Sequence, residues 1–123
     1  MNMRVLLTGG SGQLGVELLK LRDFIAPTRA EMDITMREQV TSYLEGVKPD
    51  MIVHAAAYTN TSLPEKSAKA AVECYGANVI GTRNVVRAAK CPILFISTES
   101  ALEPHNFYVL TKLRAEMEVK RHY

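Results

Sequence analysis

A turn rich in glycine near the N-terminus constrains the fold of this chain more than any other feature. The apolar run Val5–Leu7 predicts a buried strand, and glycines then recur at Gly9, Gly12 and Gly15. The helix predicted after the turn carries leucines at i, i+4 and i+7: Leu14, Leu18 and Leu21. Such a strand–turn–helix opens the dinucleotide-binding βαβ unit, in which the glycines permit the turn, admit a pyrophosphate and let the helix pack closely. An ordinary glycine-rich strand–turn–helix is the alternative, whereas the lack of a following Gly-Lys-Ser/Thr excludes a phosphate-loop NTPase.

Length and charge limit the class of protein. The 123 residues suffice for one domain with a real core, and the formal net charge of +2 gives no reason to expect a nucleic-acid or membrane partner. No signal peptide precedes the first strand, so we expect a cytoplasmic protein. Cys74 and Cys91 are expected to stay reduced and without chemistry. The scattered His54, His105 and His122 predict no metal site.

Predicted strands and helices alternate along the rest of the chain. Strands are expected at 23–26, 32–34, 51–53 and 92–97, and helices at about 35–47, 64–90 and 107–121. Thr35 and Glu38 have capping-box spacing, and so do Ser62 and Glu65. Gly76 and Gly81, inside the long helix, indicate close approach by a neighbour. The alternation predicts an α/β fold: a Rossmann-like, doubly wound parallel sheet of about five strands in the order 3-2-1-4-5, with three αβα layers and one domain over 1–123.

The end of the second predicted strand bears on cofactor choice. A fold that prefers NAD usually has an acidic residue there, which bonds the ribose 2′-OH. This chain has Thr28 and Arg29 instead, and the Arg29 guanidinium could pair with the 2′-phosphate of NADP. We therefore expect NADP to be preferred, with NAD possible, although a solvated surface arginine is an equally good interpretation of Arg29.

Tyr108 and Lys112 are four residues apart on the last predicted helix, which places both side chains on one helix face. A lysine ammonium near a phenol lowers the pKa of the phenol, and a tyrosine so tuned can donate a proton to a carbonyl oxygen while hydride arrives at carbon. Thr98, after the preceding strand, could orient the same oxygen. The spacing is common by chance, so its position after that strand is what strengthens the hypothesis.

The chain resembles the extended short-chain dehydrogenase/reductases, and within that superfamily of NAD-dependent epimerases and dehydratases it most resembles the dTDP-4-dehydrorhamnose reductases. The matching segments follow the order of the family and cover nearly the whole chain. They are TGGSGQLG at 8–15, TRAEMDIT at 28–35, KPDMIVHAAAYT at 48–59, NVIGTRNVVRAA at 78–89, ISTE at 96–99 and NFYVLTKLRAE at 106–116.

The resemblance implies a role for each matching position. The glycines would hold the pyrophosphate, with backbone N–H groups at the turn, and the next positions would contact the adenosine ribose, the adenine and the nicotinamide half. The implied cofactor-binding residues are Gly9, Gly12, Gln13, Leu14, Gly15, Arg29, Asp33, Ile34, Ala55, Ala56, Ala57, Tyr58 and Lys112. The implied catalytic residues are Thr98, Tyr108, Lys112 and Asn78, the last of which would complete a proton relay.

Two departures from the family limit what the resemblance implies. Thr98 and Tyr108 are only ten positions apart, and Glu99 and Ser100 replace the usual Asp-Tyr pair. The match to the family ends with the helix that carries Tyr108 and Lys112, so we expect the later strands and the C-terminal substrate-binding domain to be absent. We therefore expect either an NADP-dependent reductase of a nucleotide sugar, in a minimal or truncated form, or a non-catalytic NAD(P)-binding module that acts as a sensor or partner subunit.

An oligomer is also expected. Without the later strands, the apolar segment 93–96 would form an unpaired edge that favours association with another chain. The resemblance adds that the helices at about 64–90 and 107–121 commonly form the dimer bundle of the superfamily. The sequence therefore predicts a homodimer or a larger assembly.

Overall fold

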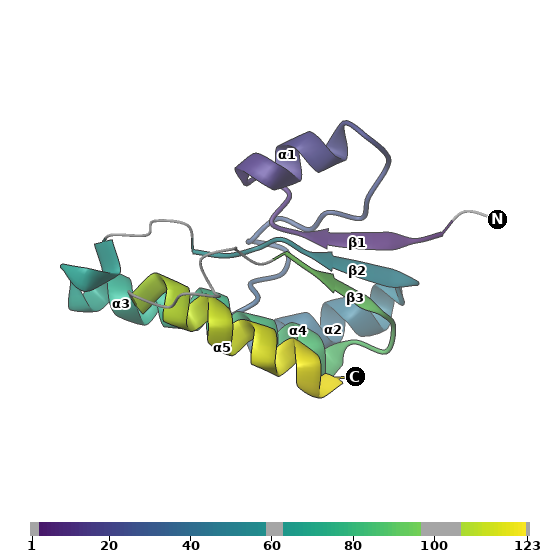
Figure 1. Ribbon diagram of the computed structural model, residues 1–123. Coiled ribbons are helices and arrows are strands. Elements are labelled where there is room, and N and C mark those ends of the chain that lie inside the picture. The colour runs from purple at the N-terminus through teal and green to yellow at the C-terminus, as the bar shows by residue number, and fades with distance from the viewer. Residues whose placement is uncertain (1–2, 59–62, 97–106, 123) are drawn as a thin grey trace.

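The computed structural model describes residues 3–58, 63–96 and 107–122. Its sheet has three parallel strands in the order β1-β2-β3, namely β1 (Val5–Thr8), β2 (Met51–His54) and β3 (Ile93–Phe95). Helix α1 (Gln13–Leu19) lies on one face of the sheet (Figure 1). The opposite face carries α2 (Arg37–Val47), α3 (Ala68–Tyr75), α4 (Gly81–Ala88) and α5 (Phe107–His122). The predicted α/β class with a parallel sheet is confirmed.

The strands are apolar because helices cover both faces of the sheet. On the side of α2 and α4, the core consists of eight buried residues: Leu6, Met32, Val40, Leu44, Ile52, Val85, Val86 and Ile93. On the side of α1, the core is smaller and consists of Val5, Leu7 and Val53. Leu7, Val53 and Leu94 are neighbours across the three strands, yet Leu94 is 50% exposed. The apolar face of the sheet therefore extends beyond the area that α1 covers (Figure 1).

The five predicted strands are reduced to three in the described residues. Around Ile25, the chain makes only an isolated parallel bridge with Leu6, in which Leu7 N donates to Ile25 O at 2.8 Å. The segment 32–34 is not a strand, and it leads into a turn at 34–35. The Asp33 side chain accepts hydrogen bonds from Thr35 N at 3.0 Å and from Thr35 Oγ1 at 2.7 Å, which competes with extended pairing.

The same competition makes the predicted capping box of α2 wrong. The N-cap of α2 is Met36, without a side-chain hydrogen bond, because the Thr35 hydroxyl is already bonded to Asp33. The helix ends at Val47, the predicted end, and its C-cap is Lys48, whose φ is 51°. The short α1 differs too, because Leu21 lies beyond its end and both Leu14 and Leu21 are exposed.

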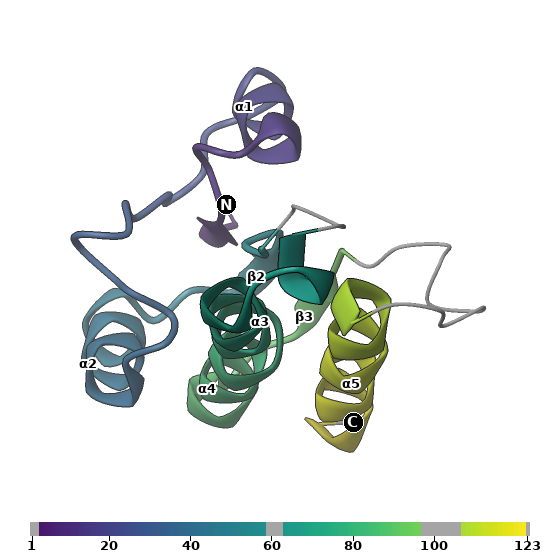
Figure 2. The same ribbon diagram turned by 90° about the vertical axis from the view of Figure 1, so that its left-hand side faces the viewer.

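The long predicted helix is divided into consecutive segments. A 3-10 turn, Leu63–Glu65, precedes α3, and a π-helical segment, Gly76–Ile80, joins α3 to α4. Ser67 caps α3, since its Oγ accepts a hydrogen bond from Ala70 N at 3.2 Å. The predicted helix start at Ser62 lies outside the described residues. Helices α3 and α4 follow one line, and α5 lies beside them (Figure 2). Within the described ranges, no helix is both long and apolar enough to cross a membrane.

Candidate functional site

The glycine turn after β1 has a geometry that side chains would disrupt. Gly9 has φ +75°, and a Cβ there would lie 2.6 Å from Ala56 N. A Cβ on Gly15 would lie 2.0 Å from Gly9 O, so α1 packs directly on the turn. Gly12 differs, because a Cβ there would meet only Gly9 O at 3.4 Å. Gly12 is also the N-cap of α1 and provides no side-chain cap, which leaves the first amides of the helix to be satisfied from outside.

A buried series of hydrogen bonds between side chains lies beneath this turn and connects it to α4. Thr8 Oγ1 accepts from Ala56 N at 3.0 Å and lies 2.7 Å from His54 Nδ1. His54 Nε2 lies 2.9 Å from Thr82 Oγ1 on α4. A neutral imidazole has one N–H and one bare nitrogen, so His54 donates to one of these two threonine hydroxyls and accepts from the other. The sequence predicted no role for His54, although Thr8 and His54 form the last residue pair of neighbouring strands.

The burial of His54 predicts a pH-dependent stability. Burial, followed by the charge of Lys112, lowers the pKa of His54 to about 3 from 6.5. The unfolded chain binds a proton below pH 6.5 that the folded chain does not, so the free energy of unfolding should fall by up to about 1.4 kcal/mol per pH unit from pH 6.5 towards 3. Urea denaturation of the wild type and of His54→Gln should show a shallower dependence in the variant. Parallel curves for the two proteins would contradict the prediction.

Asn78 connects three parts of the structure. Its Oδ1 accepts from Tyr58 N at 2.8 Å, and its Nδ2 donates to Thr111 Oγ1 on α5 at 3.0 Å. The Nδ2 also lies 3.5 Å from Cys74 Sγ. Asn78 belongs to the π-helical segment, which presents it to both the loop after β2 and α5. The residues after β2, from Ala55 to Tyr58, are thereby held against the helix layer.

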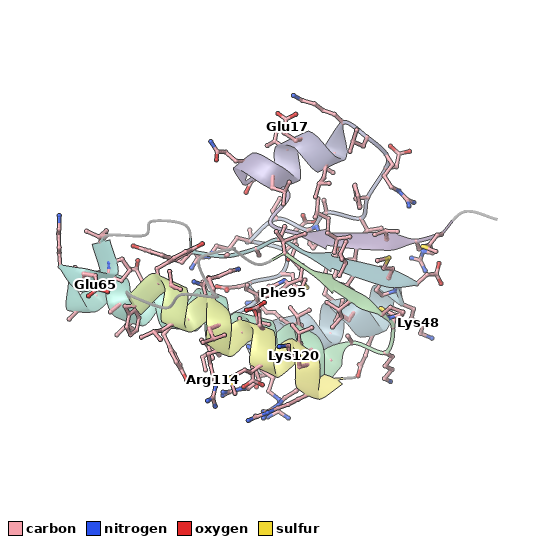
Figure 3. The ribbon with its side chains drawn as sticks, in the orientation of Figure 1. Glu17, Lys48, Glu65, Phe95, Arg114 and Lys120 are labelled. Carbon is pink, nitrogen blue, oxygen red and sulfur yellow. The ribbon has the colours of Figure 1, made fainter. Side chains whose placement is uncertain are left out.

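Lys112 is bound at the end of β3. Its side chain is buried, its Nζ donates to Ile96 O at 3.2 Å, and the Nζ lies 4.8 Å from the centroid of the Phe95 ring. Figure 3 labels Phe95, whose ring lies between the sheet and α5 and also stacks on His54 with centroids 5.8 Å apart. Tyr108 lies one turn earlier on α5. Thr98, the third proposed catalytic residue of this region, lies outside the described residues.

The predicted effect of Lys112 on Tyr108 is wrong for this structure. Burial, with a smaller contribution from Cys74, raises the pKa of Tyr108 and does not lower it. Burial also lowers the pKa of Lys112. The reason is that the lysine ammonium is directed to the Ile96 carbonyl and the Phe95 ring. Tyr108 therefore remains a neutral phenol, which can donate a proton.

Arg29 and Asp33 form a second part of the candidate site. Arg29 Nε lies 3.7 Å from Asp33 Oδ2, and the Arg29 side chain is 86% exposed. Burial opposes ionisation of Asp33, but hydrogen bonds from Thr35 and the charge of Arg29 outweigh it and lower the pKa of that carboxyl. Arg29 thus has a carboxylate partner in the protein itself and remains open to solvent.

The structure gathers most of the candidate residues at the ends of the strands. The glycine turn meets the loop after β2, Asn78 joins that loop to α5, and Lys112 on α5 reaches the end of β3. Arg29 and Asp33 are joined to each other through their ion pair. Among the residues that the structure describes, no group of three or more histidine, cysteine or acidic side chains could hold a metal ion.

Comparisons with known proteins agree with this architecture. The family described as the RmlD substrate binding domain matches residues 3–123. A dTDP-4-dehydrorhamnose reductase from Aggregatibacter actinomycetemcomitans is 36% identical over 105 residues, which cover 78% of this chain and 35% of that protein. A GDP-6-deoxy-D-talose 4-dehydrogenase from the same organism is 38% identical over 109 residues, with the same coverage of 78% and 35%.

Solved structures give the same result. The dTDP-4-dehydrorhamnose reductase of Bacillus anthracis str. Ames, crystallised in complex with NADP, superposes with a TM-score of 0.92 at 30% identity and covers 100% of this chain and 50% of its own. The Bordetella bronchiseptica enzyme WbmG, in complex with NAD, has a TM-score of 0.80 at 20% identity and shares the fold. The chain thus spans about a third of the curated relatives and half of these solved ones. The match over residues 3–123 shows that the chain belongs to the RmlD substrate binding domain family.

Proposed function

We propose that this chain is a single dinucleotide-binding domain that binds NADP, with NAD as a weaker ligand. The observation that carries the proposal is the packing of the glycine turn, where Gly9 lies against Ala56 and Gly15 lies against Gly9. This packing brings backbone amides to an open edge without side chains between them, as a pyrophosphate requires. The NADP in the B. anthracis relative supports the same choice of cofactor.

The test is a fluorescence titration of the purified chain with NADPH and with NADH. We expect NADPH to bind more tightly, because the Arg29 guanidinium can pair with the 2′-phosphate. Arg29→Ala should remove most of this preference and weaken NADPH by about tenfold, in the range of one charge-assisted hydrogen bond. Lys20→Ala, which removes an exposed cation at the C-terminal end of α1, serves as a control for net charge. Equal affinities for the two cofactors in the wild type would contradict the assignment of Arg29, and binding of neither would contradict the proposed function.

We further propose that the bound dinucleotide serves the reduction of a 4-keto nucleotide sugar, the chemistry named by the dTDP-4-dehydrorhamnose reductases. NADPH, when bound, would supply the hydride. Tyr108 would donate its phenolic proton to the carbonyl oxygen, and its raised pKa keeps that proton available at neutral pH. Lys112 would leave the Ile96 carbonyl to hold the nicotinamide ribose, and Asn78 would fix the loop that carries Tyr58.

A non-catalytic NAD(P)-binding module, a sensor or a partner subunit, is the second candidate. The observation in its favour is that Lys112 is buried with its ammonium on Ile96 O, so that it does not lower the pKa of Tyr108. NADPH binding without oxidation of NADPH in the presence of dTDP-4-dehydrorhamnose would favour this candidate. Turnover that depends on Tyr108 would favour the reductase.

A homodimer through α3, α4 and α5 completes the proposal. Large apolar side chains are exposed on α3 and α5, which lie side by side (Figure 2): Val72, Tyr75, Leu110 and Met117. A second copy would bury them. We expect light scattering at micromolar concentration to report a dimer, and Val72→Lys to shift it towards monomer. Leu21→Lys, which replaces an exposed leucine next to α1, should leave the dimer intact. A wild-type monomer would contradict this prediction.

A further inference from the structure

The turn at 33–35 is held by its own hydrogen bonds. Asp33 Oδ1 accepts from Thr35 N and from Thr35 Oγ1, and Met36 N donates to Asp33 O at 3.0 Å. The other Asp33 oxygen, Oδ2, lies 3.7 Å from Arg29 Nε. The conformation of this turn therefore decides where the carboxylate that faces Arg29 is located.

Helix α4 holds the same turn from a distance of 50 residues in the sequence. Asn84 is 9% exposed, and its Nδ2 donates to Ile34 O at 2.8 Å. One helical turn earlier, a Cβ on Gly81 would lie 2.6 Å from Ile34 Cδ1, so the Ile34 side chain packs on the helix backbone itself. From α2, Gln39 Oε1 accepts from Asp33 N at 2.9 Å. Main-chain groups of both Asp33 and Ile34 are thus bonded by side chains of other elements.

This contact also connects the turn to the glycine-rich edge of the sheet. Thr82, the neighbour of Gly81, is bonded to His54, and His54 is bonded to Thr8, the residue before Gly9. One segment of α4 therefore contacts two parts of the site. Thr82 bonds to His54 below the glycine turn, and Asn84 bonds to Ile34 in the turn that carries Asp33. A pyrophosphate would lie at the glycine turn, and the adenosine ribose would lie near the turn at 33–35. The relative placement of the two turns therefore sets the distance between these two parts of the site.

We propose that Asn84 is a positioning residue for the adenosine end of the dinucleotide, and that it sets the preference for NADPH over NADH through Ile34 and Asp33. The inference rests on the proposed function. Loss of the Asn84 amide frees Ile34 O, and Asp33 then no longer holds Arg29 at one place. The 2′-phosphate depends on Arg29 and the 2′-hydroxyl does not, so NADPH loses more affinity than NADH.

The test compares two substitutions of Asn84, one that preserves its shape and one that preserves its amide. Asn84→Asp replaces the donating amide by an acceptor opposite the Ile34 carbonyl, whereas Asn84→Gln keeps a donating amide on a longer side chain. We expect Asn84→Asp to weaken NADPH and 2′,5′-ADP by about three- to tenfold, the range of one lost hydrogen bond, and to weaken NADH less. Asn84→Gln should recover part of the loss. Arg87→Ala, an exposed position on the same helix, should bind as the wild type does.

Gln39→Ala keeps the test decisive if Asn84→Asp does not fold. Gln39 is exposed, so its loss costs little stability, but it frees Asp33 N and should reduce the NADPH preference in the same direction. Asn84→Asp could instead fold with a lower thermal midpoint but bind NADPH and 2′,5′-ADP as the wild type does, with an unchanged preference for NADPH over NADH. That result would overturn the proposal and leave Asn84 a purely structural role. If Asn84→Asp does not fold, wild-type affinity and preference in Gln39→Ala would overturn it. A wild type that binds neither cofactor would instead overturn the proposed function, and this inference with it.

Discussion

Gly15→Ala is expected to abolish measurable NADPH binding and to lower the free energy of unfolding by about 3 kcal/mol or more. The added Cβ would lie 2.0 Å from Gly9 O and 2.7 Å from Gly10 Cα, both of them main-chain atoms. No side-chain rotation relieves such an overlap, so α1 must move away from the turn. This movement takes the first backbone amides of α1 away from Gly9, so the turn and the helix no longer form one binding site for the pyrophosphate. Urea denaturation and an NADPH titration of the same preparation measure both effects.

Gly12→Ala is the matched control, because the two glycines are in one turn but have different surroundings. A Cβ on Gly12 would meet only Gly9 O at 3.4 Å, which is an ordinary contact, and Gly12 has φ −76°, which alanine adopts readily. The variant should fold with nearly wild-type stability and still weaken NADPH, because the methyl group occupies the approach of the pyrophosphate. Wild-type stability and binding in Gly15→Ala would refute the close-packing argument. Wild-type binding in Gly12→Ala would remove Gly12 from the proposed site.

The glycine turn was predictable because its requirement is local. The positive φ at Gly9 and the approach of α1 at Gly15 involve residues of one short segment, whereas the contact of Gly9 with Ala56 is long-range. The predicted end of α2 at 47 is also found, but the left-handed conformation of Lys48 after it was not predictable, since that conformation usually favours glycine. Thr35 shows the same limit of local patterns. Its hydroxyl could have capped the next helix, but it bonds to Asp33 instead. Short-range patterns identify the hydrogen bonds and backbone conformations that are possible locally, but the packing around them decides which one forms.

Long-range contacts account for what the sequence could not predict of the candidate site. The sequence suggested no role for His54 or Asn84, and it did not predict the partners of Asn78. All three residues bond to residues at least 20 positions away, and no spacing rule connects such pairs. The direction of the Tyr108 pKa shift was wrong for a related reason. The i, i+4 spacing correctly placed Tyr108 and Lys112 on one helix, but the lysine ammonium is directed to Ile96 O, a partner that only the tertiary structure supplies.

Tyr108→Phe is expected to lower the rate of NADPH oxidation with dTDP-4-dehydrorhamnose by about 10²- to 10⁴-fold, the usual contribution of a positioned proton donor. The substitution removes the phenolic hydroxyl and keeps the ring. Tyr108 is not among the residues proposed to hold the dinucleotide, so NADPH affinity should stay within about twofold of the wild type, well below the effect of one hydrogen bond to a charged group. The loss should therefore appear in kcat. Steady-state kinetics and the NADPH titration of the same protein separate the two quantities.

Lys112→Met gives the contrast that assigns the roles. The methionine fills the buried volume of the lysine stem without a charge, so the fold is expected to survive. If Lys112 holds the nicotinamide ribose, this variant loses NADPH affinity as well as kcat, whereas Tyr108→Phe loses kcat alone. A Tyr108→Phe protein within threefold of the wild-type rate would exclude Tyr108 as proton donor. Because burial raises the pKa of Tyr108, the wild-type rate should also stay high through neutral pH and fall only in the alkaline range, where the phenol loses its proton.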